Sequence, residues 1–189
     1  MLVTIAEINQ RLRFARKRLD QLLSLNGGDL LGAKDDERLQ LFQEFFFHLI
    51  GSAENVAGYV NYSRNLNIPI EQISIKRVVA KINESSNPLK NELCSLYADT
   101  RKQNLPDDPY SDEGYNYRAW NYRNQVTHRH KNPLLFKLNV SSGERQACLI
   151  LDPRKPEPDY SYKPVQDDLS QIFDLFKKKC ARVVECVSQ

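Results

Sequence analysis

The chain has 189 residues, a length that usually folds around one hydrophobic core, and we expect a single helical domain over residues 1–189. Hydrophobic residues make up 41% and charged residues 27%, which excludes the composition of a disordered chain. The 27 lysines and arginines nearly balance the 24 aspartates and glutamates, so the net charge of +3 does not by itself indicate a nucleic-acid-binding protein. Any case for RNA binding must therefore rest on local residues.

The sequence carries no signal that indicates a membrane-spanning, secreted or metal-binding protein. Residues 1–14 are amphipathic and charged, unlike the apolar core of a signal peptide. The longest apolar run, residues 45–50, is far shorter than the roughly 20 residues that span a bilayer. The four cysteines lack CxxC spacing, so free thiols are favoured over disulfides and a structural zinc site is not expected. We predict a cytoplasmic protein that needs no metal or cofactor and does not bind membranes.

The first half of the chain is predicted to be helical. Apolar residues recur at three- and four-residue steps from Ile5 to Leu22, which predicts a helix that ends at Gly27 and Gly28. A longer helix begins near Asp35 and carries an apolar series from Phe42 to Val60. Two shorter helices are predicted over residues 70–82 and 87–97, the second opened by Pro88 at its first position.

The second half combines helices with a short β-hairpin. Residues 104–112 form a loop by their prolines and aspartates, and Ser111 or Asp112 is positioned to cap a helix over 113–129. The β-prone runs 134–140 and 145–151 flank a Gly-containing loop and predict a hairpin. A proline-rich connector, 153–164, leads to a last helix with an apolar stripe from Leu169 to Val187. The predicted fold is mainly α: a bundle of about five to six helices with a small β-hairpin insertion before the C-terminal helix.

A helical wheel of residues 113–129 separates two faces. At about 100° per residue, one stripe is predicted to face the core, and the opposite stripe carries polar and aromatic side chains that are expected to face outward. Solvated helix faces more often carry Glu and Lys, so the polar stripe indicates a function. The core stripe is Tyr115, Ala119, Tyr122 and Val126; the outward stripe is Tyr117, Asn121, Asn124 and His128; Trp120, Arg123 and Thr127 lie on the flank between them.

Two residues of this helix suit metal-independent cleavage of RNA. The Arg123 guanidinium stays charged and can bind phosphate through two bonds, whereas the His128 imidazole titrates near neutrality and can move a proton in either direction. A base of this kind can remove the ribose 2′-hydroxyl proton while the arginine stabilises the charged phosphorane. Asn124 could orient the imidazole or hold a phosphate oxygen. The two residues are five positions apart, so Arg123 must reach around the helix toward His128.

The sequence Arg123-Asn124-x-x-x-His128 resembles the R-polar-x-x-x-H motif of the HEPN superfamily, helical domains found in toxin–antitoxin, abortive-infection and other RNA-processing systems. The resemblance implies a homodimeric, metal-independent endoribonuclease of a toxin–antitoxin or phage-defence system, with Arg123 and His128 of both subunits lining a shared cleft. One HEPN toxin subgroup carries a tyrosine, two residues after the histidine, that a partner nucleotidyltransferase modifies. His130 stands at that position here, so control by this modification is not expected. A nucleotidyltransferase-type antitoxin is expected by analogy only.

Other interpretations of the same residues stay open. Arg123 and His128 could be a structural pair at a helix C-terminus, and the domain could be a non-catalytic HEPN-like module for RNA or nucleotide binding or for dimerisation, or an unrelated scaffold. For the aromatic residues, packing against helices or a dimer partner is favoured over base stacking. The candidates for RNA binding are Tyr117, Trp120, Asn121, Thr127, Arg129 and His130.

Residues outside this helix are interpreted more simply. His48 is expected to be a buried, hydrogen-bonded histidine on a core helix. The basic strings 11–18 and 177–182 are better explained as solvated helix faces than as a nucleic-acid groove. Three acidic residues could assist His128, and the sequence does not choose among them: Glu54, Glu92 and Asp99.

Overall fold

The structure is a computed structural model that describes residues 3–24, 35–82, 87–129, 134–138, 145–151 and 162–188. For residues 35–36, 126–129, 134–138 and 145–146 it describes the backbone alone.

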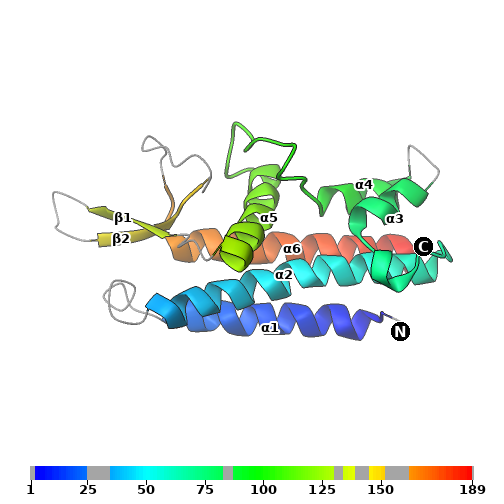
Figure 1. Cartoon of the computed structure of the whole chain (residues 1–189), viewed down its shortest axis with the longest axis horizontal. Helices are drawn as coiled ribbons and strands as arrows, with labels where there is room; N and C mark the ends of the chain where they lie inside the picture. Colours follow the sequence, from blue (N-terminus) through cyan, green and yellow to red (C-terminus); the bar gives the residue numbers. More distant parts are fainter. Residues whose placement is uncertain are drawn as a thin grey trace.

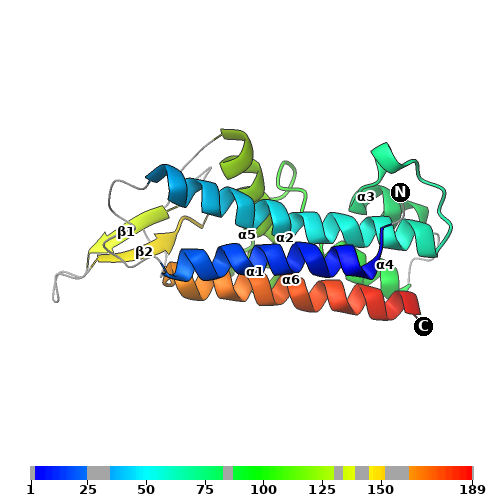
Figure 2. The same ribbon diagram turned by 90° about the horizontal axis from the view of Figure 1, so that it is seen from below.

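Three long helices form the body of the molecule: α1 (Ile5–Ser24), α2 (Asp35–Ser63) and α6 (Val165–Ser188). They lie side by side along the long axis, with α1 and α2 antiparallel and α6 alongside both (Figure 1, Figure 2). The predicted apolar stripes of all three helices meet in one hydrophobic core, which confirms the mainly α class. Within the described residues, no helix is both long and apolar enough to span a membrane.

Short elements connect α2 to the second half of the chain. The Asn61 side chain exchanges hydrogen bonds with the backbone of Ile68 at 3.0 Å in each direction, and this holds the turn that follows α2. The predicted 70–82 helix is divided into a 3₁₀ turn, η2 (Ile70–Gln72), and a short helix, α3 (Ile75–Lys81). Asn87 caps α4 (Pro88–Ser95), which has proline at its start as predicted.

Helix α5 (Asp112–Arg129) packs steeply across α2 and α6 (Figure 1). Its start is capped by Ser111, whose hydroxyl accepts a hydrogen bond from the backbone N–H of Gly114 at 3.1 Å, as the sequence indicated. A Cβ at Gly114 would lie 2.5 Å from the carbonyl oxygen of Asp108, so only glycine allows the 97–111 loop to approach the helix this closely. The loop therefore covers the first turns of α5.

The predicted hairpin is present between α5 and α6. Strand β1 (Leu134–Leu138) pairs antiparallel with β2 (Arg145–Leu149), and Phe136 lies opposite Ala147 at the centre of the register. Cys148 forms a further bridge with Pro164 just before α6, and both Cys148 and Leu149 are buried. The hairpin is thus attached to the start of α6 and extends the helical body at one end (Figure 1).

Candidate functional site

The polar stripe of α5 does not face outward over its first half. Tyr117 is 2% exposed and Asn121 1% exposed, so the outward orientation predicted for them is wrong. The cause is the cover provided by the 97–111 loop, which lies against α5 on the side that the helical wheel left to solvent. The core positions Tyr115, Ala119 and Tyr122 are buried as predicted.

The aromatic residues of α5 pack within the protein. The indole N–H of Trp120 donates to the carbonyl oxygen of Leu96 at 2.9 Å, and the Trp120 ring meets the Tyr97 ring edge-on at 5.2 Å. This confirms packing, the favoured interpretation, over base stacking for Trp120 and Tyr117. Neither residue offers a ring face to a base in this arrangement, and Asn121 is buried with them. The side chains of Thr127 and Arg129 and the whole of His130 lie outside the described residues.

Residues 114–122 of α5 are all buried, and Arg123 is the next residue along the helix and is partly exposed. Its Nη2 lies 3.8 Å from Oε1 of Glu54 on α2, and its Nη1 donates to Oδ1 of Asn124 at 3.2 Å. Nδ2 of Asn124 in turn donates to the Thr100 hydroxyl at 3.2 Å, and Thr100 is buried in the loop before α5. The guanidinium is therefore held in position by two residues while its side chain remains 28% exposed. We call Arg123, Asn124, Glu54 and Thr100 the Arg123 cluster.

His128 lies on α5 in the last turn, because the helix continues to Arg129. Its side chain, and hence its distance from the Arg123 guanidinium, lies outside the described residues.

Of the three acidic residues considered for the site, the structure places one beside the motif. Glu54 contacts Arg123, whereas Glu92 pairs with Arg182 at 4.0 Å and Asp99 with Lys76 at 3.9 Å. Thr100 was not predicted, because a threonine in a loop carries no sequence signal that links it to an asparagine on another element.

A second group of partly exposed side chains lies on α1 and α2. His48 is half-buried, and its Nδ1 lies 3.2 Å from Nη1 of Arg11. Since a guanidinium only donates, Nδ1 is the acceptor and the neutral ring carries its proton on Nε2. Burial lowers the pKa of His48, the Arg11 charge lowers it further, and Glu44 opposes both. The predicted hydrogen-bonded histidine is confirmed, with more exposure than expected.

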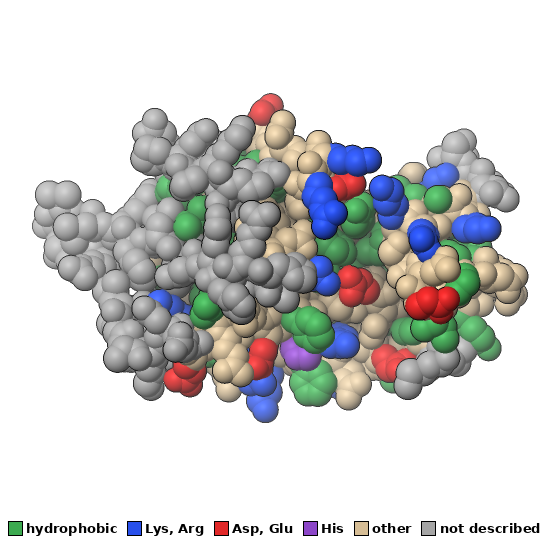
Figure 3. Space-filling view, viewed as in Figure 1, with side chains coloured by type: hydrophobic (Ala, Val, Ile, Leu, Met, Phe, Trp, Pro, Cys, Tyr) green, Lys and Arg blue, Asp and Glu red, His purple; other side chains and the backbone are tan. Residues whose placement is uncertain are grey.

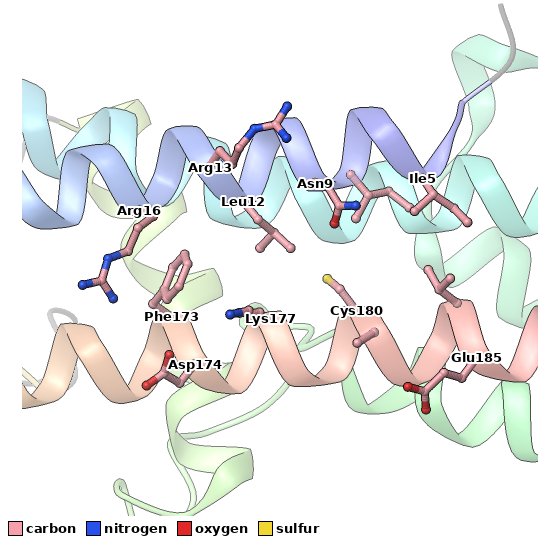
Figure 4. Close-up of a pocket in the computed structure, with 13 residues that line it drawn as sticks. Ile5, Asn9, Leu12, Arg13, Arg16, Phe173, Asp174, Lys177, Cys180 and Glu185 are labelled. Carbon is pink, nitrogen blue, oxygen red and sulfur yellow. The ribbon is translucent and has the colours of Figure 1, made fainter.

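Two cavities of about 780 Å³ lie elsewhere on the described surface. The first is a groove between α1 and α6, where Leu12 and Phe173 lie between flanking charges; Figure 4 shows Arg16 beside Phe173, and their guanidinium-to-ring distance is 5.8 Å. Arg13 of one basic string and Lys177 of the other both line it, but so do Asp174 and Glu185, so its charge is mixed. The groove therefore gives no reason to replace the solvated-face interpretation with a nucleic-acid site.

The second cavity lies among α4, α5 and α6. Lys179 lines it and is nearly buried, with its ammonium donating to the carbonyl oxygen of Ser95 at 2.7 Å. Burial lowers the pKa of Lys179, and the nearby carboxylates of Asp112, Glu92 and Glu113 oppose this shift. Both cations and carboxylates line this cavity, and the arrangement does not select one ligand.

The described residues contain no group of three or more His, Cys, Asp or Glu side chains placed to hold a metal ion. The four cysteines are free thiols, as favoured by their spacing, and burial raises the pKa of Cys180 to about 12. Comparison with protein-family models, curated proteins and solved structures finds no match for this chain.

Proposed function

We propose that the chain is a metal-independent endoribonuclease of the HEPN type. His128 acts as the acid and base, Arg123 binds the scissile phosphate, and Asn124 holds Arg123 in position. The protein acts as a cytoplasmic homodimer in which the motif-bearing ends of α5 from two subunits line one cleft.

The geometry of Arg123 is the observation that carries this proposal. The guanidinium is positioned by Asn124 at 3.2 Å, and Asn124 is itself fixed to Thr100. The contact between Arg123 and Glu54 is loose, at 3.8 Å, and both of these side chains are partly exposed. A phosphate that makes two charge-assisted hydrogen bonds can therefore displace Glu54 from this guanidinium at little cost. Arg123 meets the requirement for a phosphate clamp, which must be oriented in advance and still accessible.

The reaction follows from these groups and from ribose chemistry. His128 takes the proton of the 2′-hydroxyl, the 2′ oxygen attacks phosphorus, and the bond from phosphorus to the 5′ oxygen breaks. The products are a 2′,3′-cyclic phosphate and a free 5′-hydroxyl. The 5′ oxygen takes its proton from a second acid, for which the dimer offers the partner subunit's His128. Arg123 stabilises the charge that develops on the phosphorane.

The cellular setting of the proposal is a toxin–antitoxin or phage-defence system. A nucleotidyltransferase-type antitoxin would be the partner by analogy with the HEPN toxins. Since His130 stands where one toxin subgroup has its modified tyrosine, such a partner would control this chain by another means, for instance by covering the cleft.

The test is cleavage of a mixed single-stranded RNA pool in EDTA by the purified protein, beside His128→Ala and Arg123→Lys variants. We expect cleavage with chelator present and 2′,3′-cyclic phosphate ends. His128→Ala should lower the rate about 10²- to 10⁴-fold, since this is the usual contribution of acid–base catalysis. Arg123→Lys should lower it about 10²-fold, because lysine keeps the charge but loses the bidentate contact.

Arg182→Ala is the matched control, because Arg182 is also partly exposed and loosely paired with a glutamate, at 4.0 Å from Glu92. It should cleave like the wild type. If the wild type leaves RNA intact, or if His128→Ala cleaves equally, the chain is not this nuclease and the non-catalytic binding module becomes the better description.

A further inference from the structure

An exposed aromatic surface lies on α1 and α2. Phe14 is 45% and Phe47 47% exposed, although most large aromatic side chains of the described residues are buried. The His48 ring lies between them, 5.1 Å from the Phe14 ring and 5.4 Å from the Phe47 ring. Figure 3 shows hydrophobic side chains on both sides of the purple imidazole on the exposed face. Three ring systems therefore form one continuous surface.

Arg11 gives this surface a positive charge. Its guanidinium lies over the Phe47 ring, 5.0 Å from the centroid, and its Nη1 is 3.2 Å from Nδ1 of His48. Among the residues that the structure describes, Arg11 forms no ion pair with a carboxylate. Its charge is therefore available to an anion. We call Phe14, Phe47, His48 and Arg11 the aromatic strip.

The strip leads directly to the Arg123 cluster. Phe47, Gly51 and Glu54 are spaced four and three residues apart on α2, so they share one face, and Phe47 and Glu54 are about 10 Å apart along the axis. A Cβ at Gly51 would lie 3.5 Å from Nε of Arg11, which places the Arg11 side chain against this glycine. Arg11 thus fills the space between Phe47 and Glu54, and Glu54 contacts Arg123.

We propose that the aromatic strip binds the unpaired bases of single-stranded RNA that flank the bond to be cut, with Phe47 as the stacking surface and Arg11 as a phosphate contact. This inference rests on the proposed function, because it extends the same site. Exposed rings beside a cation that no carboxylate neutralises are the kind of surface that single strands bind, since every base has a face to stack and every nucleotide a negative charge. An apolar protein partner would instead bury the Arg11 guanidinium without a counter-charge, at a large desolvation cost.

The experiment measures RNA affinity and stacking without cleavage. Every protein carries His128→Ala, and the probe is a short single-stranded RNA with 2-aminopurine and a terminal fluorophore. Phe47→Leu keeps an apolar side chain of similar size but removes the ring. We expect this change to weaken binding about 5- to 100-fold, the range for loss of one base–aromatic stack, and to abolish the quenching of 2-aminopurine. Phe47→Trp should restore both signals.

Tyr62→Ala is the control, because Tyr62 is another exposed aromatic residue of α2, 59% exposed and about 22 Å further along the helix. It should leave affinity and quenching unchanged. If Phe47→Leu binds RNA like its parent, the inference is overturned; if it instead dissociates a dimer without changing RNA affinity, a second copy covers the strip. Because binding is measured in a His128→Ala background, failure of the strip is distinguishable from failure of the nuclease.

Discussion

Two arginines of α5, Arg118 in its first half and Arg123 in its second, have opposite environments. Arg118 is fully buried and donates to both carboxylate oxygens of Asp168, at 3.1 and 2.5 Å. Arg123, five residues later, is partly exposed and meets Glu54 at 3.8 Å. The terminal nitrogens of the first guanidinium are bonded to Asp168 inside the fold, whereas the second guanidinium is positioned but open to a ligand. Residue type alone therefore does not indicate which arginine of a helix is accessible to a ligand; this depends on the elements that pack over it.

Other side chains pack closely around the buried Arg118–Asp168 pair. The Arg118 guanidinium also lies 5.3 Å from the Tyr110 ring and 5.6 Å from the Tyr115 ring. Lys163 lies over Tyr110 at 4.4 Å and donates to the Tyr115 hydroxyl at 3.0 Å. Burial raises the pKa of Asp168, and the bonds from Arg118 oppose that shift. The pair links α5 to α6, and Lys163 of the connector before α6 contacts the tyrosines beside it.

The largest effect is expected on breaking this pair. Asp168→Asn should lower the free energy of unfolding by about 3–5 kcal/mol, because it leaves the Arg118 charge buried without its partner. Urea unfolding followed by circular dichroism measures the change. The double variant Arg118→Met, Asp168→Leu should recover most of the loss, since no charge is then buried. A loss below about 1 kcal/mol for Asp168→Asn would mean that the two halves of α5 do not differ as described.

Most of the fold could be predicted from periodicity and caps. The stripes of α1, α2 and α6 follow helical spacing, and Ser111, Pro88 and the hairpin runs have local signals that the structure confirms. The division of the 70–82 helix was not foreseen. Pro69 and Ser74 each begin an element there, and Ser74 caps α3 by accepting from the backbone N–H of Arg77.

The site could be predicted only in part, because exposure depends on tertiary cover. The helical wheel placed Tyr117 and Asn121 opposite the core, which is right for a helix with one covered face. Helix α5 is covered on both sides over its first half, by α2 and α6 and by the 97–111 loop, so both residues are buried. The Arg118–Asp168 pair was missed for the same reason, since the two residues are 50 positions apart and nothing local links them.

The cover over α5 also depends on one glycine. Gly114→Ala should lower the free energy of unfolding by about 1–3 kcal/mol or more, because its Cβ would lie 2.5 Å from backbone atoms of Asp108 and Pro109, which cannot move aside as a side chain can. Thermal unfolding measures the effect. The control is Gly51→Ala on α2, where the nearest atoms lie at 3.5 Å or more and the gain in helix propensity should raise stability by up to about 1 kcal/mol. Equal effects at both glycines would argue against a tightly packed loop.

The smallest effect on stability is expected at Arg123. Arg123→Gln removes an ion pair at 3.8 Å between partly exposed side chains, so the free energy of unfolding should change by less than about 1 kcal/mol. The same urea titration used for the buried pair measures this change, and Arg118→Gln is the internal comparison, with an expected loss several times larger. A stability loss at Arg123 as large as that at Arg118 would identify Arg123 as a structural residue, and a loss of RNA cleavage in that variant would no longer support a phosphate clamp. A small loss together with lost cleavage assigns Arg123 to the chemistry, because the fold is then shown not to need its charge.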